Sequence, residues 1–400
     1  MNETRNNLTG IKEKLMSLLS IPWLVFGVYF LAGVVAPMLK FADGNWNNIK
    51  IFFHSSHHLF AEQDLYAAYP QEYGDFFLYG PIFSVFAIPF AFLPDWLGVF
   101  LFLTTTTAVF LAGVYSLNYT GKEKALFCWI CFFDFLTNQQ NFQTNSLIAG
   151  GILLSLSAIQ RNRVLFSTFV TAFGLLVKIY GGVALVLFLF TKHRVKFAIS
   201  FLLFTVALIL VPAVFSSFDF ALSSYGSWFD RLEAKNASVL NTPVDQFGYR
   251  SLFDFSRRTL GIELPQRAIL GVAAILTLIA LSSWKLWHCK SHLAELAIAS
   301  AMVGIVIFST GAESPTFIIL QAGLALWFLY KRRVNPRIAW VGLGIVVLFS
   351  SLSPTDLFYG ELGEAYGRLA LRALPCTLLW LTILVDMWLL GRKPNLEEPS

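Results

Sequence analysis

Ionisable side chains gather in one segment of the chain, residues 40–80, which lies between two apolar stretches. The segment includes three aspartates and three histidines: Asp43, Asp64, Asp75, His54, His57 and His58. Carboxylates and imidazoles are side chains that often transfer protons in catalysis. The segment is much longer than the about 12–15 residues beyond which structureless loops become uncommon, and such long loops are usually functional or disordered. We therefore expect reactive groups here.

The carboxylates near the end of this segment are candidates for a general base. A base that takes a proton from a hydroxyl acceptor works best when its pKa is near neutral, and partial burial at a membrane boundary raises a carboxyl pKa in that direction. Glu72 and Asp75 are three residues apart, so in a helix they would share one face. The alternative is that each acid is a solvated loop charge or a helix cap.

The histidines of this segment also have two interpretations. His54 and His58 are four residues apart, which places them on one side of a helix and favours a polar interfacial face. The alternative is a metal or acid–base cluster. The segment has no HxxEH-type pattern, and we expect neither a metal nor a cofactor.

Two polar features interrupt the apolar remainder of the chain. Residues 138–146, NQQNFQTNS, contain amides that must be hydrogen-bonded or meet water if they lie near hydrocarbon. They form either an interfacial turn or an amide wall for a polar ligand such as a sugar. Lys178 lies among apolar residues, where an ammonium costs about 2.5–3.5 kcal/mol on insertion scales. It either snorkels to the surface or faces a cavity and binds phosphate, and Gly181 and Gly182 permit a helix break beside it.

A second polar stretch, residues 216–266, mixes aromatic and charged side chains. Trp228 and its neighbouring tyrosines suit sugar faces, and arginines such as Arg250 suit phosphate. An amphipathic interfacial helix with an aromatic belt would have the same composition.

Composition excludes soluble globular proteins. Hydrophobic residues make up 56% of the 400 and charged residues only 13%, against about a quarter in soluble domains. The net charge of +5 comes largely from short basic clusters between apolar runs, which indicates membrane topology and not nucleic-acid binding. Cys128 and Cys131 lie in an apolar run, so we interpret them as core residues and expect no disulfide framework.

Hydropathy predicts an all-α, polytopic integral membrane protein of about 11–13 helices, forming a single domain over residues 1–400. The positive-inside rule places both termini in the cytoplasm and residues 40–80 and 216–266 outside. This topology requires that the short run 81–93, which Pro89 interrupts, does not cross fully. Residues 164–190 are either one span or two half-helices that meet at Lys178. Asp134 and Asp386, near helix ends, are interpreted as structural acids.

The order of these features resembles the GT-C superfamily of membrane glycosyltransferases, and within it the polyprenyl-phosphate-mannose-dependent α-mannosyltransferases. One helix precedes a long outer loop with a Tyr-Pro-rich end, LYAAYP…FFLYGP. Gln143-Thr144-Asn145 follows at the head of a helix, and Lys178-Ile179-Tyr180 comes later. These motifs cover roughly the first half of the chain, and the second half is similar in hydropathy alone.

The resemblance implies transfer of a hexose, mannose by the family's specificity, from a polyprenyl-phosphate sugar to a glycan, glycolipid or protein on the outer face of the plasma (inner) membrane. It implies that Lys178, Gln143 and Asn145 line the donor pocket, to which we add Tyr180 and Arg250. The side chains that we assign to the acceptor are Asn48, His58, Tyr79 and Trp228.

The chain departs from that family at the expected base. The family's aspartate after the first helix corresponds here to Asn48, which cannot accept a proton as a base. We therefore assign the base to Asp75, beside the Tyr79-Gly80-Pro81 turn, with Asp64 and Asp43 as alternatives. Two other functions remain open: a transporter or flippase of a lipid-linked sugar, for which the expected inverted repeats are not evident, and a non-catalytic subunit of a glycan-synthesis complex.

Overall fold

The computed structural model describes residues 17–241, 251–282, 290–353 and 369–390, and within these ranges every regular element is a helix. This confirms the all-α prediction. The elements up to residue 210 are α2 (Pro22–Phe30), η1 (Leu31–Val35), α3 (Ala36–Ala42), α4 (Asn47–Ala61), α5 (Pro81–Ala91), α6 (Asp95–Ser116), α7 (Gly121–Gln140), α8 (Asn145–Gln160), α9 (Val164–Val177), η2 (Ile179–Leu189) and α10 (Arg194–Leu210). The later elements are η3 (Val211–Val214), α11 (Phe218–Asn241), α12 (Leu252–Phe255), η4 (Ser256–Leu260), α13 (Gln266–Leu281), α14 (Lys290–Ile307), η6 (Ser314–Thr316), α15 (Phe317–Val334), α16 (Pro336–Val346), η7 (Val347–Ser351) and α18 (Ala373–Leu390).

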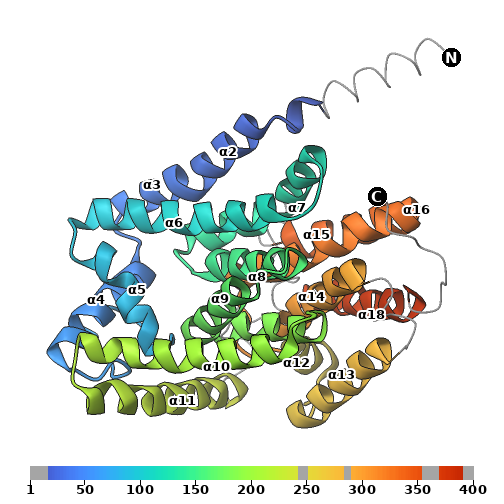
Figure 1. Ribbon diagram of the computed structural model, residues 1–400. Helices are drawn as coiled ribbons and strands as arrows, with labels where there is room; N and C mark the ends of the chain where they lie inside the picture. The colour runs from blue at the N-terminus through green and yellow to red at the C-terminus, as the bar shows by residue number, and fades with distance from the viewer. Residues whose placement is uncertain (1–16, 242–250, 283–289, 354–368, 391–400) are drawn as a thin grey trace.

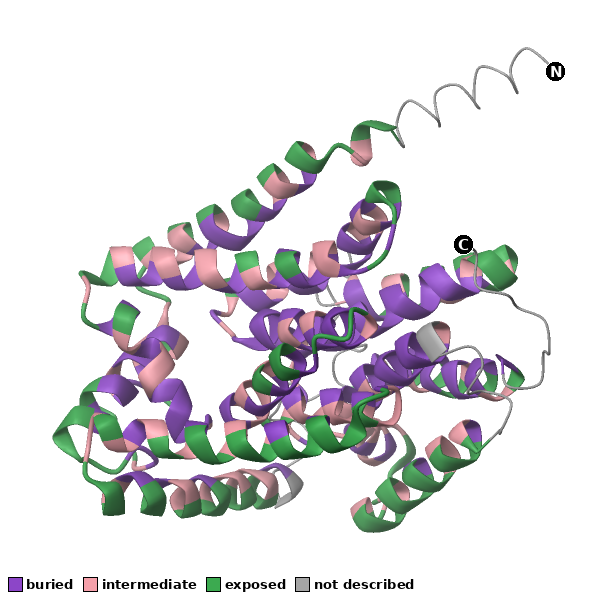
Figure 2. Cartoon of the chain, in the orientation of Figure 1, coloured by how far each residue is buried: buried purple, intermediate pink, exposed green. Residues whose placement is uncertain are grey.

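Within the described residues, four helices are long and apolar enough to cross a membrane: Pro22–Ala42, Asp95–Ser116, Arg194–Val214 and Ala373–Leu390. Their outer surfaces agree with this role. Along α10 the large apolar side chains of Val195, Leu202 and Leu203 are exposed, and Figure 2 shows this helix with an exposed face while α15 is almost wholly buried. Such a face is stable against lipid and not against water. The protein is therefore an integral membrane protein.

The helices are arranged around a central group formed by α8, α9, α14 and α15. Figure 1 places α4 and α5 together at one end of the molecule, whereas α16 and α18 lie toward the other end. The helices α10 and α11 run side by side along one flank, and α14 contacts both α15 and α18.

The helix α5 is too short to cross a bilayer. Its 11 residues rise about 1.5 Å each, which gives about half of the roughly 30 Å hydrocarbon core. The result agrees with the prediction that residues 81–93 do not cross fully, on which the predicted topology depends.

The chain breaks at Lys178, as the half-helix interpretation predicted. The helix α9 ends at Val177 and the 3₁₀ helix η2 begins at Ile179, while Lys178 between them has extended backbone angles (φ −153°, ψ 127°). A Cβ atom on Gly181 would lie 2.3 Å from the backbone carbonyl carbon of Gly174. Glycine at 181 therefore lets the first turn of η2 pack directly against the last turn of α9.

One local prediction was wrong, because Glu72 and Asp75 do not share a helix. The helix α4 ends at Ala61, and residues 62–80 form turns and irregular backbone, here called the 62–80 segment. Pro70 lacks a backbone N–H and Gly74 is conformationally permissive, so neither favours a helix across this stretch.

The buried acids have structural partners. Asp134 on α7 pairs with Arg372, just before α18. Asp386 on α18 accepts from Lys331 Nζ at 2.5 Å and from Trp327 Nε1 at 2.8 Å, both on α15. These contacts agree with the interpretation of both aspartates as structural acids.

Candidate active site

A cavity of about 780 Å³ collects side chains from α4, the 62–80 segment, η2, α11, α13, α14 and α18. Its volume is in the range typical of small-molecule sites. The hydrogen-bonding and charged residues on its wall include Asn48, Asp75, Tyr79, Gln143, Lys178, Tyr180, Lys235, Asn236, Ser309, Thr310 and Glu313. The apolar residues that α13, α14 and α18 contribute include Leu270, Ala273, Ala274, Leu281, Ala297, Ala301, Ile305, Trp380 and Met387. The cavity wall is thus amphipathic.

Lys178 provides a cation on this wall. Its Nζ donates a hydrogen bond to Asn145 Oδ1 at 2.7 Å and lies 5.4 Å and 5.2 Å from the ring centroids of Tyr79 and Tyr180. An ammonium has three donors, and one of them has a hydrogen-bond partner among the described residues. The remaining donors are available to a ligand in the cavity.

The side-chain amides of residues 138–146 find hydrogen-bond partners within the stretch and on neighbouring elements. Asn138 Nδ2 donates to the Gln143 carbonyl and to Ser146 Oγ, both at 3.0 Å. Gln143 lines the cavity, and its Oε1 accepts from Tyr79 OH at 2.9 Å. Asn145 is buried and fixed by its Nδ2, which donates to the Pro315 carbonyl at 3.1 Å. The stretch therefore positions Lys178 and presents one amide to the cavity.

Two carboxylates face the same cavity, Asp75 and Glu313. Asp75 is exposed, contrary to the expected partial burial, and its Oδ1 accepts from the backbone N–H of Phe76 at 2.8 Å. Burial raises the pKa of Glu313, while the charges of Lys178 and Lys235 act in the opposite direction. Sequence reasoning missed Glu313. The available signal was an isolated acid in the short connection between two apolar helices, at 309–316.

Four other predicted site residues also lie at the cavity. Tyr79, Tyr180, Asn48 and Trp228 line the cavity. Tyr180 OH is 2.6 Å from Ser309 Oγ, Asn48 Nδ2 donates to the Asn141 carbonyl at 2.7 Å, and Trp228 Nε1 donates to the Leu78 carbonyl at 3.0 Å. All four predicted side chains are therefore positioned by neighbouring elements.

The remaining candidates lie elsewhere. Asp43 is at the C-terminal end of α3, and Asp64 closes a local turn by accepting from the Tyr66 N–H at 2.9 Å. His58 is buried next to Glu72. None of these three lines the cavity. Arg250 lies outside the described residues.

Comparison with known proteins gives the family. Residues 77–310, more than half of the chain, match the model of glycosyltransferase family 87 (GT87). The chain belongs to GT87. It is thus a GT-C-type membrane glycosyltransferase, an enzyme that binds a sugar donor and an acceptor. No curated protein matches the chain significantly.

The region matched by GT87 includes the cation and much of its surroundings but not every charged group of the cavity. Tyr79, Gln143, Lys178 and Trp228 are inside residues 77–310, whereas Asp75 and Glu313 are just outside at either end. The match supports the GT-C resemblance found in the sequence.

Gly80 joins the two sides of the GT87 cavity. Its N–H donates to the Val177 carbonyl at 3.2 Å, directly before Lys178. A Cβ atom at position 80 would lie 1.9 Å from the Leu176 carbonyl oxygen. We expect Gly80→Ala to displace the 62–80 segment from α9, at a cost of about 1–3 kcal/mol by overpacking, and to reduce transfer. Thermal unfolding in detergent and the transfer rate measure the two effects.

The control for this substitution is Gly74→Ala in the same segment. A Cβ atom there would meet Asn47 Oδ1 at 3.7 Å, an ordinary contact. Equal losses of stability and transfer in both variants would contradict the proposed close approach at Gly80.

Proposed function

We propose that this GT87 enzyme transfers a hexose from a polyprenyl-phosphate sugar to a hydroxyl acceptor at the outer face of the membrane. The supporting observation is the amphipathic cavity, whose wall combines Lys178 with apolar side chains from α13, α14 and α18. A phosphate with a sugar on one side and an isoprenoid chain on the other has the same division of polarity. A nucleotide sugar has no apolar part that would use this wall.

Lys178 is proposed to bind the donor phosphate. In a displacement at the sugar C1 atom, the bond from C1 to the phosphate oxygen breaks and negative charge develops on the leaving phosphate. A fixed cation in a site sheltered from water stabilises that charge. Asn145 holds the Nζ in position by the 2.7 Å hydrogen bond, and Tyr180 forms the adjacent wall.

Asp75 is proposed as the base. As the acceptor oxygen attacks C1, its proton passes to a carboxylate oxygen, and the configuration at C1 is inverted. Asp75 Oδ1 is engaged by the Phe76 N–H, and the charge of the carboxylate also acts on the Arg231 guanidinium. Asn48, Tyr79 and Trp228 are proposed to contact the acceptor. Glu313, near Lys178, is assigned to the sugar hydroxyls.

Mannose is the proposed sugar, and this choice rests on the resemblance to the mannosyltransferases. The test uses purified full-length protein in lipid nanodiscs with polyprenyl-phosphate [¹⁴C]mannose and a membrane extract as the acceptor source. We expect labelled product from this donor and none from GDP-mannose. Label transferred only from the nucleotide sugar would contradict the proposal. For protein reconstituted into closed lipid vesicles, donor that crosses the membrane unchanged, without product, would favour the flippase alternative.

A further inference from the structure

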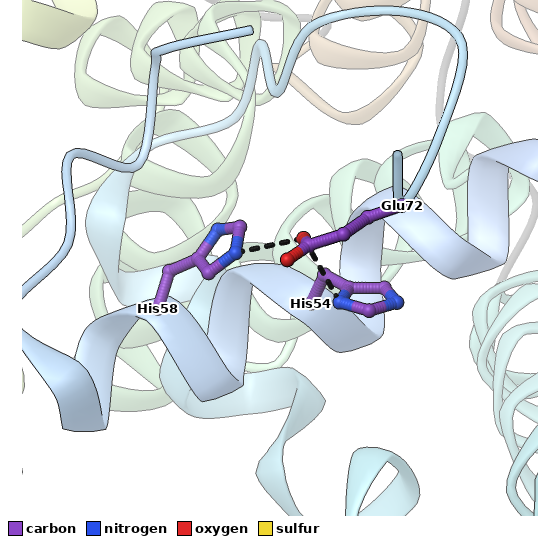
Figure 3. Close-up of side chains that lie close together, drawn as sticks. All are labelled: His54, His58 and Glu72. Carbon is purple, nitrogen blue, oxygen red and sulfur yellow. Dashed lines mark ion pairs between the residues drawn. The ribbon is translucent and has the colours of Figure 1, made fainter. Parts of the chain in front are cut away.

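Three side chains of types that bind metal ions lie close together outside the cavity. His54 and His58 lie one turn apart on α4, and Glu72 reaches them from the 62–80 segment (Figure 3). Glu72 Oε2 is 3.0 Å from His54 Nδ1 and 2.8 Å from His58 Nε2. One ligand atom from each residue lies within 4.8 Å of the other two.

Both histidines form close ion pairs with Glu72, but these contacts do not satisfy every buried polar atom of the cluster. His58 is only 2% exposed, yet neither of its ring nitrogens has a hydrogen bond of acceptable geometry among the described residues. Glu72 Oε2 is likewise a buried atom without a hydrogen-bond partner there. Buried polar atoms are normally satisfied, and two such atoms, His58 Nε2 and Glu72 Oε2, face each other at 2.8 Å, which indicates that a ligand completes the site.

The donor set fits a divalent transition metal. Zn²⁺ binds imidazole nitrogen and carboxylate oxygen at about 2.0–2.2 Å in tetrahedral geometry, which places neighbouring ligand atoms about 3.3 Å apart. The observed separations of 3.0 Å and 2.8 Å differ from this by a few tenths of an ångström. The two histidine nitrogens lie within 4.8 Å of each other, and rotation of the partly exposed His54 side chain would bring them to the tetrahedral separation. Two histidines and one glutamate also leave a fourth position for water.

Aromatic rings shelter the same point. The Tyr69 ring lies 4.0 Å from the His58 ring, and the Tyr73 ring lies 5.8 Å from the His54 ring. His54 and Glu72 retain 36% and 33% side-chain exposure, so an ion can enter from one side.

We propose that His54, His58 and Glu72 form a Zn²⁺-type metal site that ties α4 to the 62–80 segment. The site is separate from the cavity, because none of the three side chains lines it. It differs from the sequence-based expectation of no metal, since Glu72 is brought to the helix by a loop whose path the sequence pattern did not show. The proposal does not depend on the donor or acceptor of the GT87 reaction.

The test uses full-length protein with a histidine-free affinity tag, stripped with a chelator in detergent and then titrated with Zn²⁺. We expect one Zn²⁺ per chain by mass spectrometry of the metal, and visible absorption of a low-coordinate site when Co²⁺ replaces Zn²⁺. His54→Gln, His58→Gln and Glu72→Gln should each weaken Zn²⁺ binding by more than the about 10–100-fold that loss of an outer-shell partner costs.

His57→Gln is the matched control, because His57 is exposed on the same helix and lies outside the cluster. It should bind Zn²⁺ as the unmodified protein does. Replacement of the buried His58 can unfold α4, which would be seen as loss of the thermal transition in His58→Gln. In that case Zn²⁺ binding by the Glu72→Gln variant, whose side chain is partly exposed, tests the metal site. Absence of one bound Zn²⁺ per chain, equal binding by Glu72→Gln and the unmodified protein, or equal loss in His57→Gln would each overturn the proposal.

Discussion

Lys178→Met should reduce transfer by at least about 10²–10³-fold, the range seen when a single preorganised donor to a developing anion is removed. Methionine keeps an unbranched stem between the rings of Tyr79 and Tyr180 but cannot hold a phosphate. The ammonium contributes one hydrogen bond within the described protein, to Asn145, so the cost in stability should be small. Single-turnover transfer from polyprenyl-phosphate sugar, with thermal unfolding of the same preparation, separates the two effects.

Lys196→Met is the matched control for this experiment. Lys196 is exposed on α10 and does not line the cavity, so its loss should leave the rate unchanged. Transfer by Lys178→Met within tenfold of the unmodified enzyme would remove Lys178 from the donor site.

Asp75→Asn should lower kcat by about 10²–10⁴-fold, the usual contribution of a general base, with little change in donor binding. The amide keeps the size of the carboxylate and its carbonyl oxygen can still accept from the Phe76 N–H, but it cannot take up a proton. Because Asp75 is exposed, the variant should fold and insert normally. The measurement is the transfer rate at saturating donor and acceptor.

Two further variants sharpen the assignment of the base. Asp64→Asn, in the same segment but outside the cavity, should transfer at the unmodified rate. Glu313→Gln should weaken sugar binding more than it lowers kcat. A full loss of kcat in Glu313→Gln together with normal turnover by Asp75→Asn would transfer the role of base to Glu313.

Hydropathy was sufficient for the helical fold, and it gave the break at Lys178 as one of two alternatives. An ammonium between apolar runs and two following glycines have few other structural solutions, and the chain does break there. The amide-rich stretch 138–146 was identified for a similar reason, since polar groups in apolar surroundings need partners, whereas the choice of Gln143 and Asn145 came from the resemblance to the GT-C family.

Residues whose role depends on tertiary contacts were harder to predict from the sequence. Glu313 occupies a short turn with no motif around it. The charges that act on it come from Lys178, which follows α9, and from Lys235 on α11, both distant in the chain. The helical spacing of Glu72 and Asp75 suggested a shared face, but the turn residues of the 62–80 segment prevent a helix there. His54 and His58 were correctly placed on one helix, whereas their proximity to Glu72 required the folded loop.

The hydrogen bond from Gly80 to Val177 has a consequence for the coupling between the two substrates. This hydrogen bond connects the 62–80 segment, which contains Asp75, with Val177, the residue before Lys178. Both bonded groups belong to the main chain, so side-chain rotation cannot break the connection. A phosphate bound at Lys178 would therefore also favour one position of the 62–80 segment. Linkage makes such an effect reciprocal, so each substrate should tighten the binding of the other, and saturating acceptor should lower the apparent Kd for the lipid-linked sugar.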